Sequence, residues 1–282
     1  MSLVNYHNHT SMCKHAVGAP KEYIITAIKK GISEFGFSDH APLPENLRDG
    51  ITMSPLETEL YINIITKLAK KYETEITIRI GFEVDFPLYN TFDLKYLKDE
   101  RIDFLIGSCH FLSKYDMDVV TGKSTADNLE PEWAFDNPHF ISEYDKHDID
   151  DLYHIYYTNI LEAVNSRLFD IIGHFDLIKK FGHRPKKDFS PMIEKIAQNM
   201  AKYNIAAEIN TSGLQRRVRE MYPSDDIIKI FFDNNVPITL GSDSHTPESV
   251  GYAFDTAVNT IKKIGYTKIS GFAKRKRYDV NL

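Results

Sequence analysis

The feature that most constrains the fold of this chain is a set of seven short apolar segments separated by stretches with helical periodicity. The apolar segments are residues 3–7, 34–38, 76–82, 103–108, 170–174, 205–210 and 237–242. Most of them are continuously apolar rather than alternating, which is typical of strands buried on both faces of a parallel sheet. The helical patterns are residues 20–31, 54–72, 92–101, 148–167, 190–203, 224–235 and 247–265. This alternation predicts an α/β barrel of the (β/α) type, with an open doubly wound sheet as the alternative.

The length of the chain agrees with one barrel. A chain of 282 residues is typical of a single closed α/β barrel, and no repeat or change of composition marks a boundary. No glycine-rich dinucleotide motif follows the first strand, which argues against the usual cofactor use of an open sheet. We therefore expect one domain over residues 1–282.

One connection is much longer than the others. Residues 111–147 follow the fourth predicted strand and include Trp133. Loops of this length in a compact domain usually have a function, and a loop after a barrel strand lies on the catalytic face. We expect this segment to act as a lid.

Charge and cysteine content exclude several classes of protein. The net charge is −6, and the one dense basic run, 274–277, is expected to be a solvated strand or tail rather than a nucleic-acid site. Two cysteines provide no disulfide framework. No apolar run approaches the roughly 20 residues that cross a bilayer, and residues 1–20 lack the apolar core of a signal peptide. We expect a soluble, cytoplasmic protein that binds neither polymeric nucleic acid nor a membrane.

Polar side chains of the metal-ligand type stand at the carboxyl ends of the predicted strands. In chain order they are His7 and His9, Asp39 and His40, Glu83 and Asp85, His110, His174 and Asp176, Asn210, and Asp243 and His245. In a (β/α) barrel these ends converge on the face where active sites lie. Histidines scattered over surface loops would not follow the strand period. We therefore interpret the set as a metal site rather than as a surface patch of histidines.

Another histidine near the N-terminus, His15, extends the candidate ligand set. The set then holds seven histidines and two carboxylates, namely His7, His9, His15, His40, His110, His174, His245, Glu83 and Asp243. A catalytic zinc ion has about three protein ligands, so nine ligands predict two or three divalent ions. Imidazoles with few carboxylates favour Zn, Fe or Mn over Mg or Ca.

The same stretches resemble a known family. "HNHT", "SDHA", "GFEVDF", "GSCHF", "GHFDL" and "SDSH" resemble motifs of the PHP (polymerase and histidinol phosphatase) family. The resemblance covers essentially the whole barrel. It is strongest to the stand-alone histidinol-phosphate phosphatases, through "CKHA", "FGHRP", "NTSGLQRR" and "FAKRKRYDV". It implies a distorted, TIM-like (β/α)7 barrel with a trinuclear metal centre.

The resemblance also implies how the ligands are shared and what the site does. The implied ligand sets are His7, His9, Glu83 and Asp243 for the first ion, Glu83, His110 and His174 for the second, and His15, His40 and His245 for the third. Glu83 would bridge the first two ions, and both it and Asp243 would act in catalysis through the metals. The implied reaction is hydrolysis of L-histidinol phosphate to L-histidinol and phosphate by a metal-bridging hydroxide, a step of histidine biosynthesis.

Cations and a proton donor complete the expected site. Arg216, followed by Arg217, is the preferred clamp for a phosphate, because both residues follow the sixth strand on the catalytic face. Arg184 and Lys180, after the fifth strand, are further candidates. Asp39 either protonates the leaving alkoxide or orients a ligand imidazole.

Other functions share this metal site. The substrate can instead be another small monoester, such as a nucleotide, a sugar phosphate or a phosphotyrosine peptide. A nuclease or proofreading module is a further alternative, although the chain lacks its basic stripe. A non-enzymatic regulator would need a defective ligand set, and an amidohydrolase-like enzyme would need a different bridging pattern.

The leaving group of histidinol phosphate carries an amine and an imidazole. An acidic or aromatic wall is therefore expected, and its candidates in the lid are Asp116, Asp118, Glu143 and Trp133. The expected partner is thus a small-molecule phosphate monoester. Assembly into a homo-oligomer is left open.

Overall fold

The computed structural model describes residues 3–86, 96, 99–112 and 133–282. Its centre is a seven-stranded parallel sheet with the strand order β1-β2-β3-β4-β7-β8-β9. The strands are β1 (Leu3–Asn5), β2 (Ile32–Phe37), β3 (Thr77–Asp85), β4 (Phe104–Ser108), β7 (Ile171–Ile172), β8 (Ala206–Asn210) and β9 (Ile238–Gly241). All seven predicted strands are confirmed, with bounds that differ only slightly from those expected.

The sheet closes almost completely into a barrel. The backbone N–H of Tyr6 donates to the carbonyl oxygen of Leu240 at 3.0 Å, and an isolated parallel bridge joins Asn8 to Ser244 just beyond the ends of β1 and β9. These contacts bring the two outer strands together without a regular ladder among the described residues. The prediction of a distorted (β/α)7 barrel is confirmed, and the distortion lies at this seam.

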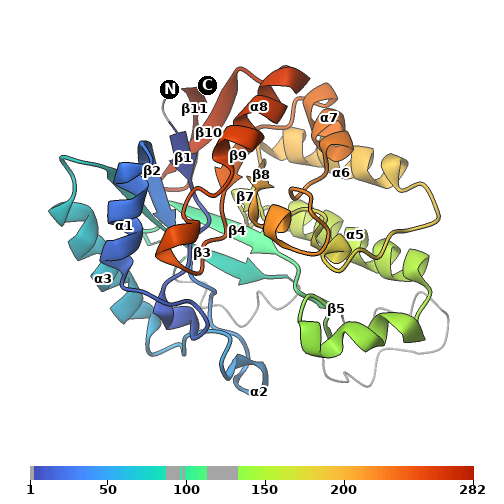
Figure 1. Cartoon of the computed structure of the whole chain (residues 1–282), viewed down its shortest axis with the longest axis horizontal. Coiled ribbons are helices and arrows are strands. Elements are labelled where there is room, and N and C mark those ends of the chain that lie inside the picture. Colours follow the sequence, from blue (N-terminus) through green and yellow to red (C-terminus); the bar gives the residue numbers. More distant parts are fainter. Residues whose placement is uncertain (1–2, 87–95, 97–98, 113–132) are drawn as a thin grey trace.

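Helices surround the sheet. In Figure 1, α1 and α3 lie on one side of the strands, and α5, α6 and α7 lie on the other. The helices are α1 (Pro20–Lys29), α2 (Glu45–Arg48), α3 (Thr58–Lys71), α5 (Ile149–Ser166), α6 (Ser190–Tyr203), α7 (Asp225–Asp233) and α8 (Phe254–Ile264). Short 3₁₀ turns follow at Ser11–Cys13, Pro138–Lys146, Leu177–Lys179, Ser212–Gln215 and Pro247–Ser249.

Local sequence explains how these helices form. Helix α1 begins at Pro20, whose fixed φ angle and missing N–H suit the first helical position. Its buried residues Tyr23, Ile24 and Ala27 share one face. The apolar face packs beside β2, and the polar face stays in solvent.

One predicted helix needs correction. Residues 247–265 form a 3₁₀ turn first, and α8 begins only at Phe254. Gly251 and Ala253 have φ angles of 61° and 52°, in the left-handed region that an α-helix does not contain. The predicted helix at 92–101 lies largely outside the described residues.

A hairpin of β10 (Lys268–Ala273) and β11 (Lys276–Asn281) lies at the N-terminal end of the barrel strands. The backbone N–H groups of Lys274 and Arg275 donate to Asp103, which precedes β4. The guanidinium of Arg275 pairs with Asp170, which precedes β7. The prediction of a solvated strand or tail is therefore wrong for Arg275, because the turn of the hairpin docks on the barrel.

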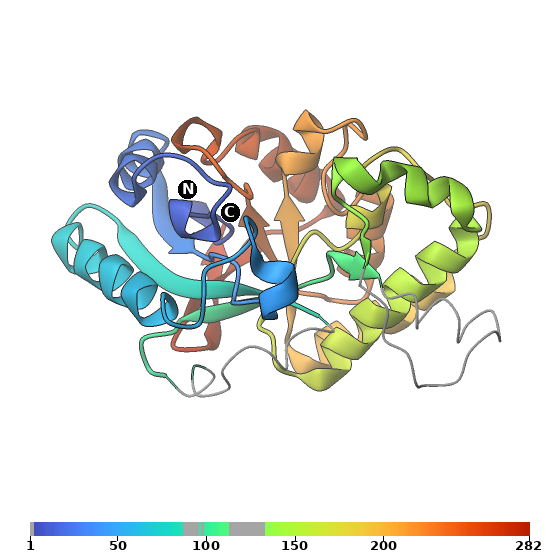
Figure 2. The same cartoon turned by 90° about the horizontal axis from the view of Figure 1, so that it is seen from below.

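The predicted lid is described only in part. Strands β5 (Phe111–Leu112) and β6 (Trp133–Ala134) pair in antiparallel orientation, and 3₁₀ turns follow at Pro138–Lys146. Figure 2 shows these turns (green) on the same side of the molecule as α5. Asp116 and Asp118 lie outside the described residues. Lid behaviour of this segment stays a prediction, as does the single domain over residues 1–282.

Within the described part of the chain, no helix has both the length and the apolar character needed to cross a membrane.

Candidate metal centre

The carboxyl ends of the strands surround a cavity of about 510 Å³. Seven of the nine predicted ligands line it directly, namely His15, His40, Glu83, His110, His174, Asp243 and His245. The other two, His7 and His9, are completely buried. The structure thus brings the whole predicted ligand set to one face of the barrel.

Glu83, at the C-terminal half of β3, is the centre of this cluster. Its side chain is buried, and its two oxygens lie within 3.5 Å of ring nitrogens from five histidines. The distances are 3.1 Å to His7, 3.4 Å to His9, 3.2 Å to His40, 3.5 Å to His110 and 2.9 Å to His174. One carboxylate therefore contacts residues from four different strand ends.

Asp243 provides the second carboxylate, from the loop after β9. Its Oδ1 lies 3.3 Å from Nε2 of His9 and 3.7 Å from Nε2 of His7. The residue has a φ angle of 49°, in the left-handed region that is uncommon outside glycine. Such backbone conformations cluster at functional sites, where the surrounding structure holds them in place.

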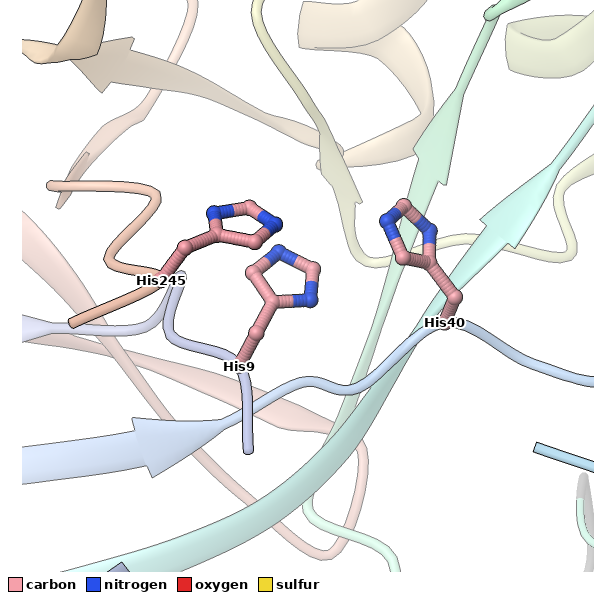
Figure 3. Close-up of side chains that lie close together, drawn as sticks. All are labelled: His9, His40 and His245. Carbon is pink, nitrogen blue, oxygen red and sulfur yellow. The ribbon is translucent and has the colours of Figure 1, made fainter. Parts of the chain in front are cut away.

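A second group of imidazoles adjoins these carboxylates. Figure 3 shows the rings of His9, His40 and His245 pointing toward one another from the ends of β1, β2 and β9. The ring of His9 is stacked on that of His245 with 4.2 Å between centroids, and it lies 4.6 Å from that of His40. Nε2 of His15 is 2.9 Å from Nε2 of His245.

Several overlapping groups have ligand atoms within 4.8 Å of one another. They include His7, His9 and Asp243; His7, Glu83 and His174; His9, His40 and His245; and Cys13, His15 and His245. These groups overlap the three implied ligand sets, with His9 close to two of them. The division of the ligands among three ions stays a prediction.

The side chains present fit divalent cations. Ring nitrogens of His7, His9, His40 and His174 are buried and have no hydrogen-bond partner among the residues that the structure describes. Buried polar atoms without partners are rare in proteins. Imidazole nitrogens that face ionised carboxylates are the donor set that zinc and related metals prefer.

The electrostatics of the cluster also favour positive charge. Burial by itself would raise the pKa of Glu83, but His7 and His40 outweigh it and hold that pKa well below its usual value. Burial lowers the pKa of His40 well below its usual value and that of His245 to about 3.

Burial by itself would also lower the pKa values of His9 and His110, but Asp243 and Asp85 outweigh it and raise each pKa to about 10. A divalent cation bound between these rings and the carboxylates would replace those protons, since metal coordination requires neutral imidazole and ionised carboxylate.

Glu208 is a functional candidate that sequence reasoning missed. Its carboxylate is buried in β8 and accepts from Nδ1 of His7 and from the backbone N–H of His174, both at 2.8 Å. Gly241 leaves room for it, since a Cβ at that position would lie 1.8 Å from Oε1 of Glu208. The sequence feature that could have indicated Glu208 is a charged residue inside an otherwise apolar strand, because charged side chains are rarely buried.

Two further side chains adjoin imidazoles of the candidate ligand set. Asp85, at the end of β3, accepts from Nδ1 of His110 at 2.7 Å. The buried thiol of Cys13 lies near His15 and His9. Burial by itself would raise the pKa of this thiol, but the two histidines outweigh it and lower that pKa to about 6.

The four predicted phosphate-binding cations separate into two pairs. Arg216 and Lys180 line the cavity, and Lys180 pairs with Asp136 at 2.8 Å. Arg184 and Arg217 do not line it. Arg184 instead pairs with a carboxylate at the surface, and Arg217 is exposed.

Asp39 is not placed where it could give a proton directly to a leaving group. It is completely buried, does not line the cavity, and accepts hydrogen bonds from the backbone N–H and the hydroxyl of Thr10. Burial raises its pKa to about 7. Its Oδ1 lies 4.0 Å from Nδ1 of His9, which agrees with the alternative role of orienting a ligand imidazole.

The described lid candidates for reading the leaving group do not reach the cavity. Trp133 packs edge-on against Tyr144, and Glu143 pairs with Lys146. Neither lines the cavity, whereas Asp136 does. Asp136 lies on the same segment, but only the folded structure shows that its side chain faces the site.

These features define an α/β barrel that carries a histidine-rich cluster of metal-ligand residues on its catalytic face. The PHP domain family matches residues 5–212 of the sequence. The chain belongs to this family.

Known relatives cover nearly the whole chain. A probable histidinol-phosphatase of Deinococcus radiodurans is 35% identical over 276 residues, which cover 97% of this chain and 98% of that protein. The histidinol-phosphatase of Bacillus subtilis is 25% identical and covers 88% of this chain and 96% of its own length.

Solved structures share the fold. A protein of Listeria monocytogenes matches with a TM-score of 0.76 at 21% identity, over 90% of this chain and 99% of that one. The histidinol phosphate phosphatase of Lactococcus lactis, solved with zinc, L-histidinol and phosphate, matches with a TM-score of 0.72 at 22% identity. That match covers 98% of this chain and 99% of the Lactococcus protein.

Proposed function

We propose that this chain is a metal-dependent phosphoric monoester hydrolase that converts L-histidinol phosphate to L-histidinol and phosphate. The observation that carries the proposal is the gathering of nine ligand-type side chains, Glu83 among them, at one face of the barrel in a chain that matches a probable histidinol-phosphatase over 97% of its length. The Lactococcus structure, which holds zinc, L-histidinol and phosphate, gives independent support for the substrate.

Two or three divalent transition-metal ions, zinc first among Zn, Fe and Mn, would be held by the nine side chains in the division given above. When bound, these ions would attract the phosphoryl group of the substrate and lower the pKa of an attacking water molecule. Glu83 suits a bridging role because its two oxygens face different histidines. Asp243 faces His7 and His9 and would complete the first ligand set.

The remaining side chains bind and orient. Arg216 and Lys180 stand in the cavity wall, where cations would contact a phosphate. Asp39 would orient His9, because it is buried behind that ring rather than exposed to the substrate. Asp136 puts a carboxylate in the same wall, where it would attract the amine or imidazole of the leaving group.

The test is a kinetic comparison of substrates on the purified chain loaded with zinc. L-histidinol phosphate is compared with β-glycerol phosphate, p-nitrophenyl phosphate and a nucleoside monophosphate, with metal content measured by elemental analysis. We expect kcat/KM for L-histidinol phosphate to exceed that for β-glycerol phosphate by about 100-fold, since a site with polar recognition groups discriminates strongly between substrates. Equal kcat/KM values for all of these esters would contradict L-histidinol phosphate as the specific substrate. Absence of turnover with every ester would contradict the phosphatase activity itself.

A further inference from the structure

The hydroxyl of Tyr222 is a polar group in the cavity wall that none of the roles above uses. Tyr222 lines the cavity and is 1% exposed. Its hydroxyl oxygen is buried and has no hydrogen-bond partner within the described ranges of the chain. Buried hydroxyl groups nearly always have a hydrogen-bond partner. The unpaired hydroxyl of Tyr222 therefore indicates that a bound ligand provides its partner.

The surrounding structure fixes the ring of Tyr222. Its backbone exchanges two hydrogen bonds with Asn210 at the end of β8, at 2.9 and 2.7 Å. A Cβ on Gly213 would lie 2.8 Å from ring atom Cε2, so the glycine allows the ring to pack on the chain. The buried ammonium of Lys179 lies 5.5 Å from the ring centroid. The hydroxyl is therefore held at one place in the wall.

A cation in the same wall as this hydroxyl, without a carboxylate partner in the described part of the chain, favours an anionic ligand. Arg216 lines the same wall, and the charged groups that act on the phenol of Tyr222 are the carboxylate of Asp176, this guanidinium, and the carboxylates of Asp243 and Asp136. Among the described residues no carboxylate pairs with Arg216, whereas Asp176 pairs with Lys179 and Asp136 pairs with Lys180. An unpaired guanidinium and a hydroxyl that line the same cavity can both bind one oxyanion.

Tyr222 is suited to donate rather than to accept. Burial raises the pKa of its phenol above the usual value, so the hydroxyl keeps its proton at neutral pH. A neutral phenol can give its hydrogen to an oxyanion without bringing a further charge into the site. Ser212 lines the same cavity, and its hydroxyl is 3.3 Å from Oδ2 of Asp243.

We propose that Tyr222 donates a hydrogen bond to a non-bridging phosphoryl oxygen of the substrate, beside Arg216. The inference rests on the proposed phosphatase function and adds a substrate-contacting residue to it. No bond to Tyr222 forms or breaks during the reaction, since the phenol only orients the phosphoryl group and stabilises its charge.

The experiment compares Tyr222→Phe with the wild-type protein, both loaded with zinc. We expect kcat/KM to fall about 10- to 100-fold, the range for a hydrogen bond to a charged group. The loss should be similar for L-histidinol phosphate and p-nitrophenyl phosphate. The inhibition constant of inorganic phosphate should rise in parallel, and the zinc content should stay unchanged.

A matched control removes a hydroxyl elsewhere. Tyr266 donates to the carbonyl oxygen of Val236 at 3.1 Å and does not line the cavity. Tyr266→Phe should therefore keep wild-type kinetics and wild-type inhibition by phosphate.

Three outcomes would overturn the inference. One is wild-type kinetics in Tyr222→Phe. Another is a decrease of kcat/KM for L-histidinol phosphate but not for p-nitrophenyl phosphate, which would indicate that the phenol protonates the leaving group. The third is a loss of zinc large enough to explain the drop in rate.

Failure of the proposed function would look different. The wild-type protein would then hydrolyse none of the esters. Calorimetric titration of inorganic phosphate into the zinc-loaded proteins would still test Tyr222, with weaker binding expected in Tyr222→Phe and equal binding contradicting the inference.

Discussion

At the scale of single residues, the geometry of the candidate metal centre depends on side chains behind the ligands. Glu208 accepts from Nδ1 of His7, which leaves Nε2 of that ring facing Glu83 at 3.1 Å. A carboxylate behind a ligand histidine fixes the tautomer and the ring orientation. The same carboxylate accepts from the backbone N–H of His174, so it connects two segments that carry candidate ligands.

Replacing Glu208 should therefore weaken metal binding without unfolding the chain. In Glu208→Gln one acceptor oxygen becomes an NH2 group that faces a donor. We expect zinc affinity to fall about 10- to 100-fold, the usual effect of losing such a partner. Competition with a chromophoric chelator measures this affinity directly.

The control for this substitution is Glu162→Gln, which makes the same chemical change at an exposed position on α5. Equal zinc affinity in the two variants would show that Glu208 does not position His7.

Which residues form the site could be predicted from the sequence only in part. His7, Glu83 and Asp243 follow buried strands, and the carboxyl ends of parallel strands meet at one face. Glu208 and Tyr222 escaped prediction because their importance comes from neighbours on other strands. Arg217 looked equivalent to Arg216, and only the fold of the turn after β8 separates them.

At the scale of elements, the β10–β11 hairpin stabilises the end of the barrel opposite to the site. Phe272 is 1% exposed and packs edge-on against Tyr6 with 5.2 Å between ring centroids. Its backbone N–H donates to the hydroxyl oxygen of Tyr6 at 2.7 Å. The hairpin is thus part of the core of the barrel.

Truncating Phe272 should lower stability but leave the metal centre intact. We expect Phe272→Ala to reduce the free energy of unfolding by about 3–5 kcal/mol, the usual cost of removing a buried aromatic ring. Urea unfolding gives this value, and elemental analysis of the folded variant should give the wild-type zinc content.

Lys276→Ala is the matched control, because Lys276 is exposed on the same hairpin. A stability change below 1 kcal/mol is expected there, at roughly the level of other surface substitutions. Loss of zinc from Phe272→Ala would contradict the separation of the two ends of the barrel.

Elements were easier to predict than their ends. Seven buried strands follow from continuous apolar runs, but β7 has only two residues because the chain leaves the ladder after Ile172. Helix α8 starts late because of left-handed backbone at Gly251 and Ala253, which apolar periodicity does not reveal. The sequence did not reveal that Arg275, in the basic run 274–277, is docked on the barrel, because its acidic partner, Asp170, is distant in sequence.

At the scale of the whole molecule, the candidate ligands join strands that are far apart in the chain. His7 follows β1 and Asp243 follows β9, the two edges where the barrel closes without a regular ladder. Glu83 contacts His7 on the β1 side of this seam and His174, which follows β7 on the other side of the sheet. Metal ions bound here would connect segments that backbone hydrogen bonding alone leaves weakly joined.

Metal removal should therefore lower the thermal stability of the whole chain. A ligand at 100 times its Kd stabilises the folded state by about 2.7 kcal/mol per site. For a chain of this size that corresponds to a change in Tm of about 5–10 °C. Chelator treatment followed by differential scanning calorimetry should show this decrease, and added zinc should reverse it.

Magnesium distinguishes a specific site from a general effect of divalent ions. A cluster of seven imidazoles and two carboxylates favours zinc, because magnesium prefers oxygen ligands. Magnesium at the same concentration should leave the Tm of the chelated protein unchanged, and Glu208→Gln should need about 10- to 100-fold more zinc for the same recovery. Two results would contradict this prediction. One is a Tm that the chelator does not change, and the other is a Tm that magnesium restores as well as zinc does. Either result would show that zinc bound at the histidine cluster does not stabilise the barrel.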